Sequence, residues 1–224
     1  MSHSRAATAL LLVLIAACTV AFLRTEQLKL RKSPIAHPHV RQAFSPGCSD
    51  PGCHAQATIR FSLRSKQRLA LAIVDSGGSV VRQLLPESSH GKGEVRVVWD
   101  GRGSNGQVVA DGRYRLRVTL ASDGRNVTIP DPIVVDTKPA SIELGRITRG
   151  PVISIAYTRG AANVRAVLVV LRGSHVVLER KAVLNPAHLA LSKLPAGSYR
   201  VEMVAVDAAG NRTPNPPFFT VTVP

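Results

Sequence analysis

The chain has 224 residues, of which 45% are hydrophobic and 4% aromatic, and 29 Lys and Arg against 14 Asp and Glu give a net charge of +15. This much apolar material can form a core, so the chain is not a disordered polycation. The composition also excludes collagen, a coiled coil and a polytopic membrane protein. Few aromatic residues argue against a nucleic-acid platform of stacked rings, and three Cys are too few for a disulfide-rich scaffold.

After a short flank at residues 1–5, one uncharged apolar stretch occupies residues 6–23 and ends at Arg24. Its length lies at the lower limit for a helix that crosses a bilayer, so we expect a single N-terminal transmembrane helix. Three interpretations are open: an uncleaved signal anchor, a lipoprotein signal acylated at Cys18, or a cleaved signal peptide with a small-residue site at 19–21. Because the residues after Cys18 stay apolar through Leu23, the pattern favours the anchor.

The charges that flank this stretch oppose the expected orientation. More basic residues follow it than precede it, which by the positive-inside rule would keep the rest of the chain in the cytoplasm. We nevertheless expect the downstream domains to be extracytoplasmic, because N-terminal segments of the signal type are often followed by exported domains. The protein would then be a single-pass cell-membrane protein.

Residues 24–40 are predicted to be a basic tether, because Pro34 and Pro38 discourage a helix. His37 and His39 lie on either side of Pro38, but no third metal ligand is close in the sequence. We therefore expect two solvated histidines and not a metal site.

From Ala43 onward the sequence has the period of two that is typical of half-buried strands. Tyr114, Leu116, Val118 and Leu120 alternate with Arg113, Arg115, Arg117 and Thr119, and turn signals such as Asn105-Gly106 separate the segments. The pattern predicts a β-sandwich at residues 41–136. Its other predicted strands are 57–63, 68–75, 79–84, 94–99 and 126–135.

A second unit of the same class is predicted at residues 137–224. Gly112 and Tyr114 recur as Gly197 and Tyr199, about one sandwich domain later in the chain. The fold class is therefore all-β, with two tandem Ig-like sandwiches after the N-terminal helix. The predicted strands of this unit are 141–144, 152–157, 164–171, 175–183, 198–207 and 218–223.

The first unit, over about residues 43–136, resembles the Ig-like domain of the flagellar hook-capping protein FlgD. The residues that carry this resemblance are Phe44, Ser45, Pro46, Trp99, Asp100, Gly101, Gly106, Gly112 and Tyr114. In the second unit, residues 205–211 resemble the hairpin of bacterial Ig-like and fibronectin-like repeats. The resemblance implies adhesion, spacing or scaffolding and no catalytic residues. It does not imply hook assembly, because the scaffolding region of the hook-capping proteins is absent.

Cys48 and Cys53 stand where the FlgD-type domains have an Asn/Asp/Gly turn. A zinc site would need more ligands, and c-type haem attachment needs a shorter Cys spacing followed by His. We expect a local disulfide that closes the Pro51-Gly52 turn in an oxidising compartment.

Other motifs give no sign of catalysis or of a bound metal or cofactor. Residues 101–106 fit G-x-G-x-x-G, but a strand and not a helix is predicted next, so a dinucleotide site is not expected. His90, His175 and His188 have no Ser or Cys partner at a recognisable spacing. Trp99 is expected to fill the core beneath its hairpin.

These features predict a non-enzymatic, membrane-anchored cell-envelope protein whose two Ig-like domains serve binding, spacing or scaffolding. The alternative is an accessory substrate-binding protein for a separate envelope enzyme, which an exposed aromatic strip would favour. Residues 137–224 carry a net charge of +7, so the expected partners are anionic envelope polymers or an envelope protein, and not nucleic acid.

Overall fold

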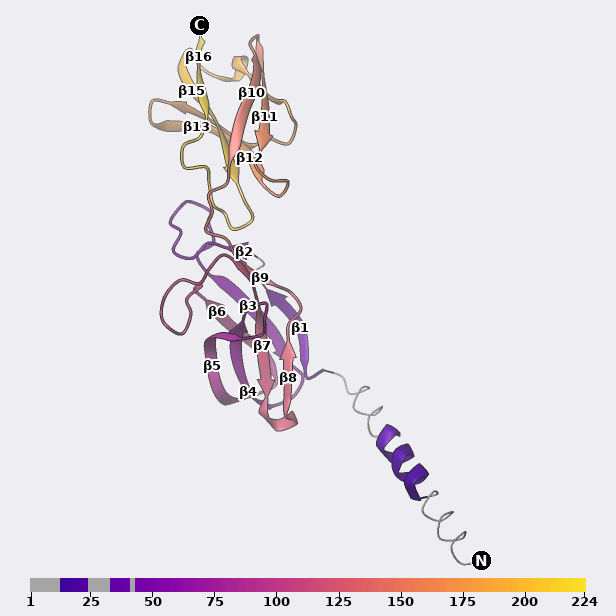
Figure 1. The fold of residues 1–224 in the computed structure, drawn as a ribbon. Helices are drawn as coiled ribbons and strands as arrows, with labels where there is room; N and C mark the ends of the chain where they lie inside the picture. The colour runs from indigo at the N-terminus through magenta and orange to yellow at the C-terminus, as the bar shows by residue number, and fades with distance from the viewer. Residues whose placement is uncertain (1–12, 24–32, 41–42) are drawn as a thin grey trace, which may run out of the picture. The chain divides into compact units, whose positions relative to one another are not determined.

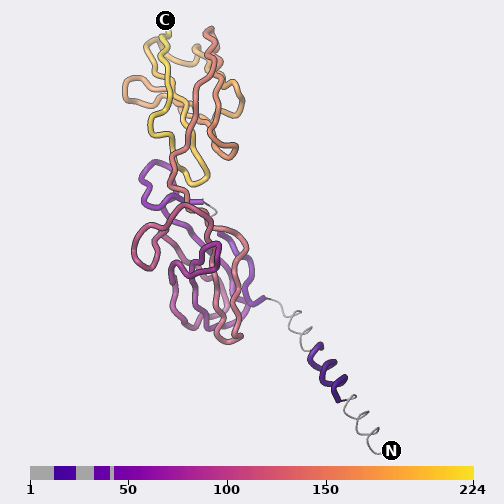
Figure 2. The backbone as a smooth tube through the Cα atoms, in the orientation of Figure 1, coloured from indigo at the N-terminus to yellow at the C-terminus, as the bar shows by residue number. Residues whose placement is uncertain are grey.

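The computed structural model describes residues 13–23, 33–40 and 43–224 (Figure 1). The chain divides into two compact units, residues 1–36 and 37–224, and each is considered by itself. Figure 2 follows the backbone of the larger unit through successive β-hairpins.

Residues 13–23 form a helix whose side chains are all exposed. Large apolar side chains, including Val13, Ile15 and Phe22, are more than half exposed, and the Thr19 hydroxyl donates a hydrogen bond to the Ile15 carbonyl at 2.8 Å. Residues 6–12 of the expected transmembrane helix lie outside the described residues. Within the described part, no helix has the length and apolarity that crossing a bilayer requires.

The predicted tether ends earlier than expected, because Ile35–Val40 forms strand β1 at the edge of a three-stranded sheet. Pro34 and Pro38 argued only against a helix, and the residues expected to form the end of the tether form a strand instead. Proline lacks a backbone N–H, but an edge strand needs hydrogen bonds on one side only, so proline is tolerated there. Residues 24–32 of the tether lie outside the described residues.

The first sandwich comprises β1 and residues 43–135 and contains two sheets (Figure 1). One has the order β1-β3-β6, and the other has the order β2-β9-β7-β4-β5 with β8 paired to β7. Its strands are β2 Ala43–Phe44, β3 Ala57–Leu63, β4 Gln67–Val74, β5 Val80–His90, β6 Gly93–Trp99, β7 Gly112–Leu120, β8 Arg125–Thr128 and β9 Ile133–Val135, with a 3-10 turn at Ala121–Asp123.

Alternation of side chains explains how these strands form a core. On β3 every second side chain is buried, and on β7 the buried series is Tyr114, Leu116, Val118 and Leu120, as the period of two predicted. The single strand expected at 126–135 is instead two strands, β8 and β9. Pro130 and Pro132 lie between them, and each removes a donor that a continuous ladder would need.

The second sandwich, residues 142–223, also has two sheets, with the orders β10-β11-β14 and β13-β12-β15-β16. Among the described strands, none from one sandwich pairs with a strand of the other. β14 is too short and too irregular in pattern to have been predicted. The strands are β10 Ile142–Thr148, β11 Val152–Arg159, β12 Arg165–Arg172, β13 His175–Lys181, β14 Ala187–Ala190, β15 Gly197–Val206 and β16 Phe218–Val223, with a 3-10 turn at Leu191–Lys193.

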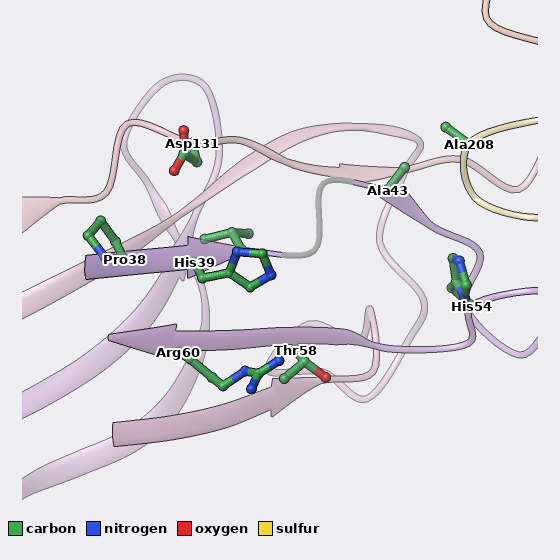
Figure 3. Close-up of a pocket in the computed structure, with 9 residues that line it drawn as sticks. Pro38, His39, Ala43, His54, Thr58, Arg60, Asp131 and Ala208 are labelled. Atoms are coloured by element: carbon green, nitrogen blue, oxygen red, sulfur yellow. The ribbon is translucent and has the colours of Figure 1, made fainter. Parts of the chain in front are cut away.

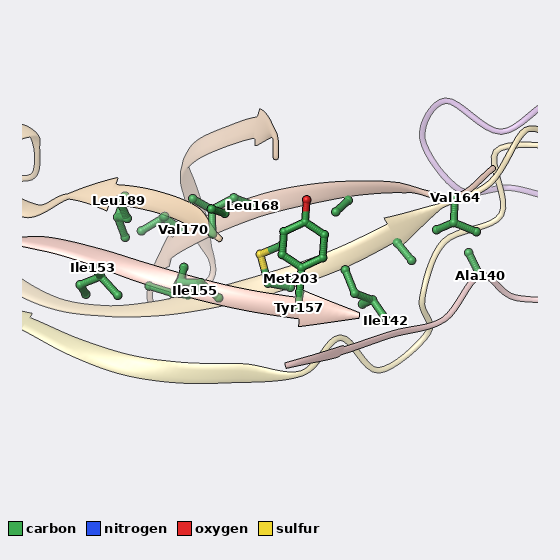
Figure 4. Close-up of a cluster of buried hydrophobic side chains, with 14 of the residues drawn as sticks. Ala140, Ile142, Ile153, Ile155, Tyr157, Val164, Leu168, Val170, Leu189 and Met203 are labelled. Atoms are coloured by element: carbon green, nitrogen blue, oxygen red, sulfur yellow. The ribbon is translucent and has the colours of Figure 1, made fainter. Parts of the chain in front are cut away.

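The core of the second sandwich lies between its two sheets. Figure 4 shows Ile155 and Tyr157 of β11 on the side that faces Leu168 and Met203 of the other sheet. The Tyr157 hydroxyl shares its one hydrogen between the carbonyls of Ala182 and Leu184, so this polar group of a mainly apolar cluster has an acceptor.

The sequence repeat corresponds to one structural device in both sandwiches. Tyr114 and Tyr199 are buried near the starts of β7 and β15, and each hydroxyl donates to the carbonyl four residues earlier, that of Ala110 or Pro195, at 2.7 Å. This is the arrangement known as a tyrosine corner in Ig-like sandwiches.

Candidate functional site

The residues of the sequence motif form the upper core of the first sandwich. Trp99 is buried, and its ring meets those of Phe44 and Tyr114 edge to face, with centroids 5.5 Å and 5.2 Å apart. The Trp99 indole N–H donates to the Arg102 carbonyl at 3.0 Å. Gly101 has a φ of +79°, and a Cβ there would clash with the Pro46 ring. The aromatic residues of the motif therefore build the core of the domain, while Asp100 and Gly106 lie in the exposed loop that follows Trp99.

The glycine-rich loop after Trp99 satisfies its own polar groups. Asp100 accepts a hydrogen bond from the Arg102 backbone N–H, and Asn105 accepts one from Gln107. The loop leads into β7, so the helix that a dinucleotide site requires does not follow. In the described part of the chain, no group of three or more His, Cys, Asp or Glu residues could hold a metal ion.

Cys48 and Cys53 are joined by a disulfide with their Cα atoms 6.3 Å apart, which confirms the predicted bond. The loop that it closes is followed by His54, whose carbonyl accepts a hydrogen bond from Ser45 at 2.8 Å. The buried Ser45 side chain belongs to the same turn. The disulfide thus holds together the two segments that lead from β2 into β3.

The disulfide loop packs against the hairpin that follows β15 in the second sandwich. His54 donates from its backbone N–H to the Ala209 carbonyl at 3.0 Å, and Ala209 is fully buried. Gly210 has a φ of +88°, and a Cβ on it would lie 2.5 Å from the Cys53 Cα. Only glycine permits this close approach without a shift of one backbone.

Two buried polar side chains complete this junction. Asn211 donates from its side-chain amide to the Asp207 carboxylate and to the backbone carbonyl of Asp136, both at 2.8 Å. Asp207 also accepts from the Asn211 backbone N–H at 2.9 Å. Asp136 follows the last strand of the first sandwich, so one side chain connects the hairpin to the segment between the sandwiches.

A cavity of about 490 Å³ lies beside the junction (Figure 3). His39 of β1 and Arg60 and Thr58 of β3 line it together with His54, and Asp131 comes from the β8–β9 loop. The remaining wall includes Pro38, Val40, Ala43 and Ala208. The chemistry of this junction pocket is that of hydrogen bonding and charge: a guanidinium, two imidazoles, one hydroxyl and one carboxylate.

The pocket was not predicted, and the sequence offers little to reveal it. Its polar residues come from three separate segments, and His37 and His39 were predicted to be solvated residues of a tether. Both are exposed, but they lie on strand β1, and His39 lines the pocket.

One pair that the sequence did not suggest is Ser154 with His188. They face each other across β11 and β14, with the Ser hydroxyl 3.0 Å from His188 Nδ1. A catalytic serine needs a base that is oriented by a third group and donors for an oxyanion. Both residues lie on the exposed face of a regular sheet, so we interpret the contact as a cross-strand hydrogen bond.

The comparison with known protein families concerns the first sandwich. The family model described as the FlgD Ig-like domain matches residues 52–124. The match includes Trp99 and Tyr114 but not Phe44 or Pro46, which the fold brings into contact with that motif.

Solved structures with similarity to the chain are also Ig-like or fibronectin-like. The fibronectin(III)-like modules of Clostridium thermocellum CbhA are 16% identical with a TM-score of 0.41, and the match covers 86% of this chain and 92% of that one. FlgD from Xanthomonas campestris is 24% identical with a TM-score of 0.28, covering 55% and 83%. FlgD from P. aeruginosa is 17% identical with a TM-score of 0.29, covering 56% and 89%. No curated protein matches the sequence.

Proposed function

We propose that this is a non-enzymatic, membrane-anchored protein of the cell envelope, which presents two Ig-like domains for binding, spacing or scaffolding. The observation that carries the proposal is the disulfide at the junction of the sandwiches. Disulfides persist in oxidising compartments and are rare in a reducing cytosol. The Cys48–Cys53 bond therefore supports an extracytoplasmic location for the β domains.

The helix at residues 13–23 supports the membrane part of the proposal. Its apolar side chains are exposed on every face, which is unfavourable in water and favourable in lipid. The Thr19 hydroxyl is satisfied by the Ile15 carbonyl, as a polar group in a nonpolar medium needs to be. The same features fit each of the three interpretations of the N-terminal segment.

The junction pocket and the charge of the chain support an anionic partner. Arg60 is exposed beside His39 and Thr58, and these groups suit a phosphate or carboxylate on an envelope polymer. Such contacts are screened beyond about 8 Å at physiological ionic strength, so binding is expected to fall as salt rises.

The alternative role, as an accessory substrate-binding protein for a separate enzyme, has less support. Trp99 and all three tyrosines are buried and offer no stacking platform for sugars. Phe218 is exposed, but the Arg200 guanidinium covers its ring at 3.6 Å from the centroid.

Topology in intact cells tests the proposal. A variant with Ser174→Cys in the exposed β12–β13 turn is treated with a membrane-impermeant maleimide, and permeabilised cells serve as the control. We expect labelling in both samples, and a Cys48–Cys53 cross-linked peptide by mass spectrometry of the unmodified protein. Labelling only after permeabilisation, together with free thiols at both cysteines, would place the domains in the cytoplasm and refute the proposal.

A further inference from the structure

Exposed apolar side chains gather along one open side of the second sandwich. Val177 on β13 is 46% exposed, and Val183 and Leu184 in the following loop are 87% and 64% exposed. Val152, at the start of β11 and opposite Ala190 of β14, is 48% exposed. Contiguous exposed apolar surface on a soluble domain commonly marks an interaction site.

Two cavities lie along this side, between the edge strands β13 and β14 of the two sheets. One has about 350 Å³ and is lined by Val177, Leu178, Leu189 and Leu194 among others. The other has about 210 Å³ and lies beside Leu168 and Leu184. Arg180 and His188 line both, so the cavities form one continuous feature, which we call the edge groove. The groove gives direct access to the core cluster drawn in Figure 4, to which Leu168 and Leu189 belong.

The charge of the edge groove has one sign. Arg180, Lys181 and Lys193 line it, and among the described residues no carboxylate does. Glu179, on the same strand, pairs with Val169 on the other face of the sheet, where its carboxylate is 3.3 Å from the Arg212 guanidinium. An occupant with acidic side chains would therefore complement the groove.

The backbone of β13 is available on the side away from β12. From Leu178 to Lys181 the strand pairs regularly with Val170 to Val167, and in the described chain no strand pairs with its other edge. The register shifts so that Val177 has no partner on β12. This is a β-bulge, in which the extra residue changes the direction of its side chain, and here Val177 lines the edge groove.

We propose that the edge groove binds an extended peptide segment of a partner protein, in which apolar and acidic side chains alternate, and that this segment adds to β13 as a further strand. Apolar side chains would enter the groove beside Val177 and Leu178, while the acidic ones, on the opposite face of the added strand, would meet Lys181, which pairs with Val167 on that face. Strand addition supplies backbone hydrogen bonds, and alternate side chains supply the specificity.

A second copy of the chain is a poorer occupant of the same edge. Pairing β13 with another β13 would bring Arg180 and Lys181 near the same cations of the copy, and the carboxylate of Glu179 already faces Arg212. The proposal gives the binding role proposed above a class of partner. It is tested in vitro, so its failure is distinguishable from a failure of the proposed topology in cells.

The probe is a fluorescent peptide of sequence Ile-Glu-Ile-Glu-Ile-Glu-Ile, and its anisotropy is measured with the full chain in nonionic detergent. We expect Val177→Lys to weaken binding about tenfold or more, since a cation replaces an apolar contact. Val176→Lys is the matched control, because Val176 pairs with Leu171 on the other face of the sheet and is similarly exposed. It should not weaken binding, because a Lys on that face lies on the side toward which the acidic side chains of the peptide point.

Two peptide variants test the mode of binding without changing the protein. N-methylation of alternate amides along one edge of the peptide should abolish binding, and methylation along the other edge should not, because only one edge pairs with β13. Replacing Glu with Lys in the peptide should also remove binding. Equal binding of both methylated peptides, equal effects of the two valine variants, or salt-independent binding would each overturn the proposal. Dimers in sedimentation that Val177→Lys separates would show instead that the edge pairs with itself.

Discussion

The two sandwiches begin one of their central strands with the same device but fill their cores differently. In the first, Tyr114 stands against Trp99, which in turn meets Phe44. In the second, the Arg172 guanidinium lies 6.0 Å from the centre of the Tyr199 ring, and the core cluster is mainly aliphatic, with Tyr157 as its other buried aromatic residue. The Gly-x-Tyr sequence thus determines how the strand starts, and the core behind it can be aromatic or aliphatic.

The largest loss of stability is expected from a change in the aromatic core of the first sandwich. Trp99→Ala should lower the free energy of unfolding of the first sandwich by about 3–5 kcal/mol, because it removes a buried ring and leaves a cavity. Hydrogen exchange with mass spectrometry on the full chain should show faster exchange in β3, β6 and β7, with little change in β12 and β15.

Met203→Ala is the reciprocal variant, and it should affect β12 and β15 with little change in the first sandwich. If either substitution accelerated exchange equally in both sandwiches, the two sandwiches would unfold as one cooperative unit. That result would contradict the prediction that each core stabilises its own sandwich.

A smaller effect is expected at the junction. Gly210→Ala places a Cβ 2.5 Å from the Cys53 Cα at a φ of +88°, so we expect a loss of about 1–3 kcal/mol and weaker protection of the His54 amide. Gly173→Ala is the matched control, since its φ is +60° and nothing lies within 4 Å of the added Cβ. If urea unfolding gave equal losses of stability for the two variants, the contact at the junction would contribute nothing to the stability of the chain.

The smallest losses of stability are expected when the hydroxyl of either tyrosine corner is removed. Tyr114→Phe and Tyr199→Phe each remove one hydrogen bond and should each cost about 1 kcal/mol in urea unfolding. A clearly larger cost at either position would show that the two corners are not equivalent.

The corner of the first sandwich also predicts a dependence on pH. Burial raises the pKa of Tyr114 above its ordinary value of 10.0, and the carboxylates of Asp75 and Asp111 add to the shift. The native state thus favours the neutral phenol, and this contribution to stability is complete below pH 10 and is lost as the pH rises through the folded-state pKa. Tyr114→Phe should remove that part of the alkaline loss, as measured by unfolding at a series of pH values.

Strands with a clear period of two were predictable from the sequence, and those that depend on tertiary contacts were not. Strands β3 and β16 begin and end at the predicted residues, because their alternation is bounded by turn signals. Strand β1 contains Pro38 and is stabilised by its place at the edge of a sheet, which a local pattern does not reveal. The short β14 depends on pairing with β11.

The disulfide was predictable because both cysteines lie in one short loop, so the spacing contains the needed information. The junction pocket and the edge groove were not, because each takes residues from segments far apart in the sequence. The position of Glu179 beside Arg212, which leaves the groove without a carboxylate, depends on the register between β12 and β13. The number of charged residues in the sequence does not predict where this carboxylate lies.

The pairing of β2 with β9 has a mechanical consequence. These strands are parallel, with Ala43 opposite Val134 and Phe44 opposite Val135; β2 follows the edge strand β1 in the chain, and β9 is the last strand of the first sandwich. Once β1 had detached from its sheet, tension along the chain would pull β2 and β9 in opposite directions along their lengths. Their hydrogen bonds would then be loaded together in shear and would not open one after another, as they do when a hairpin is unzipped. The β2–β9 pair is thereby suited to bear a pulling force that has already released β1.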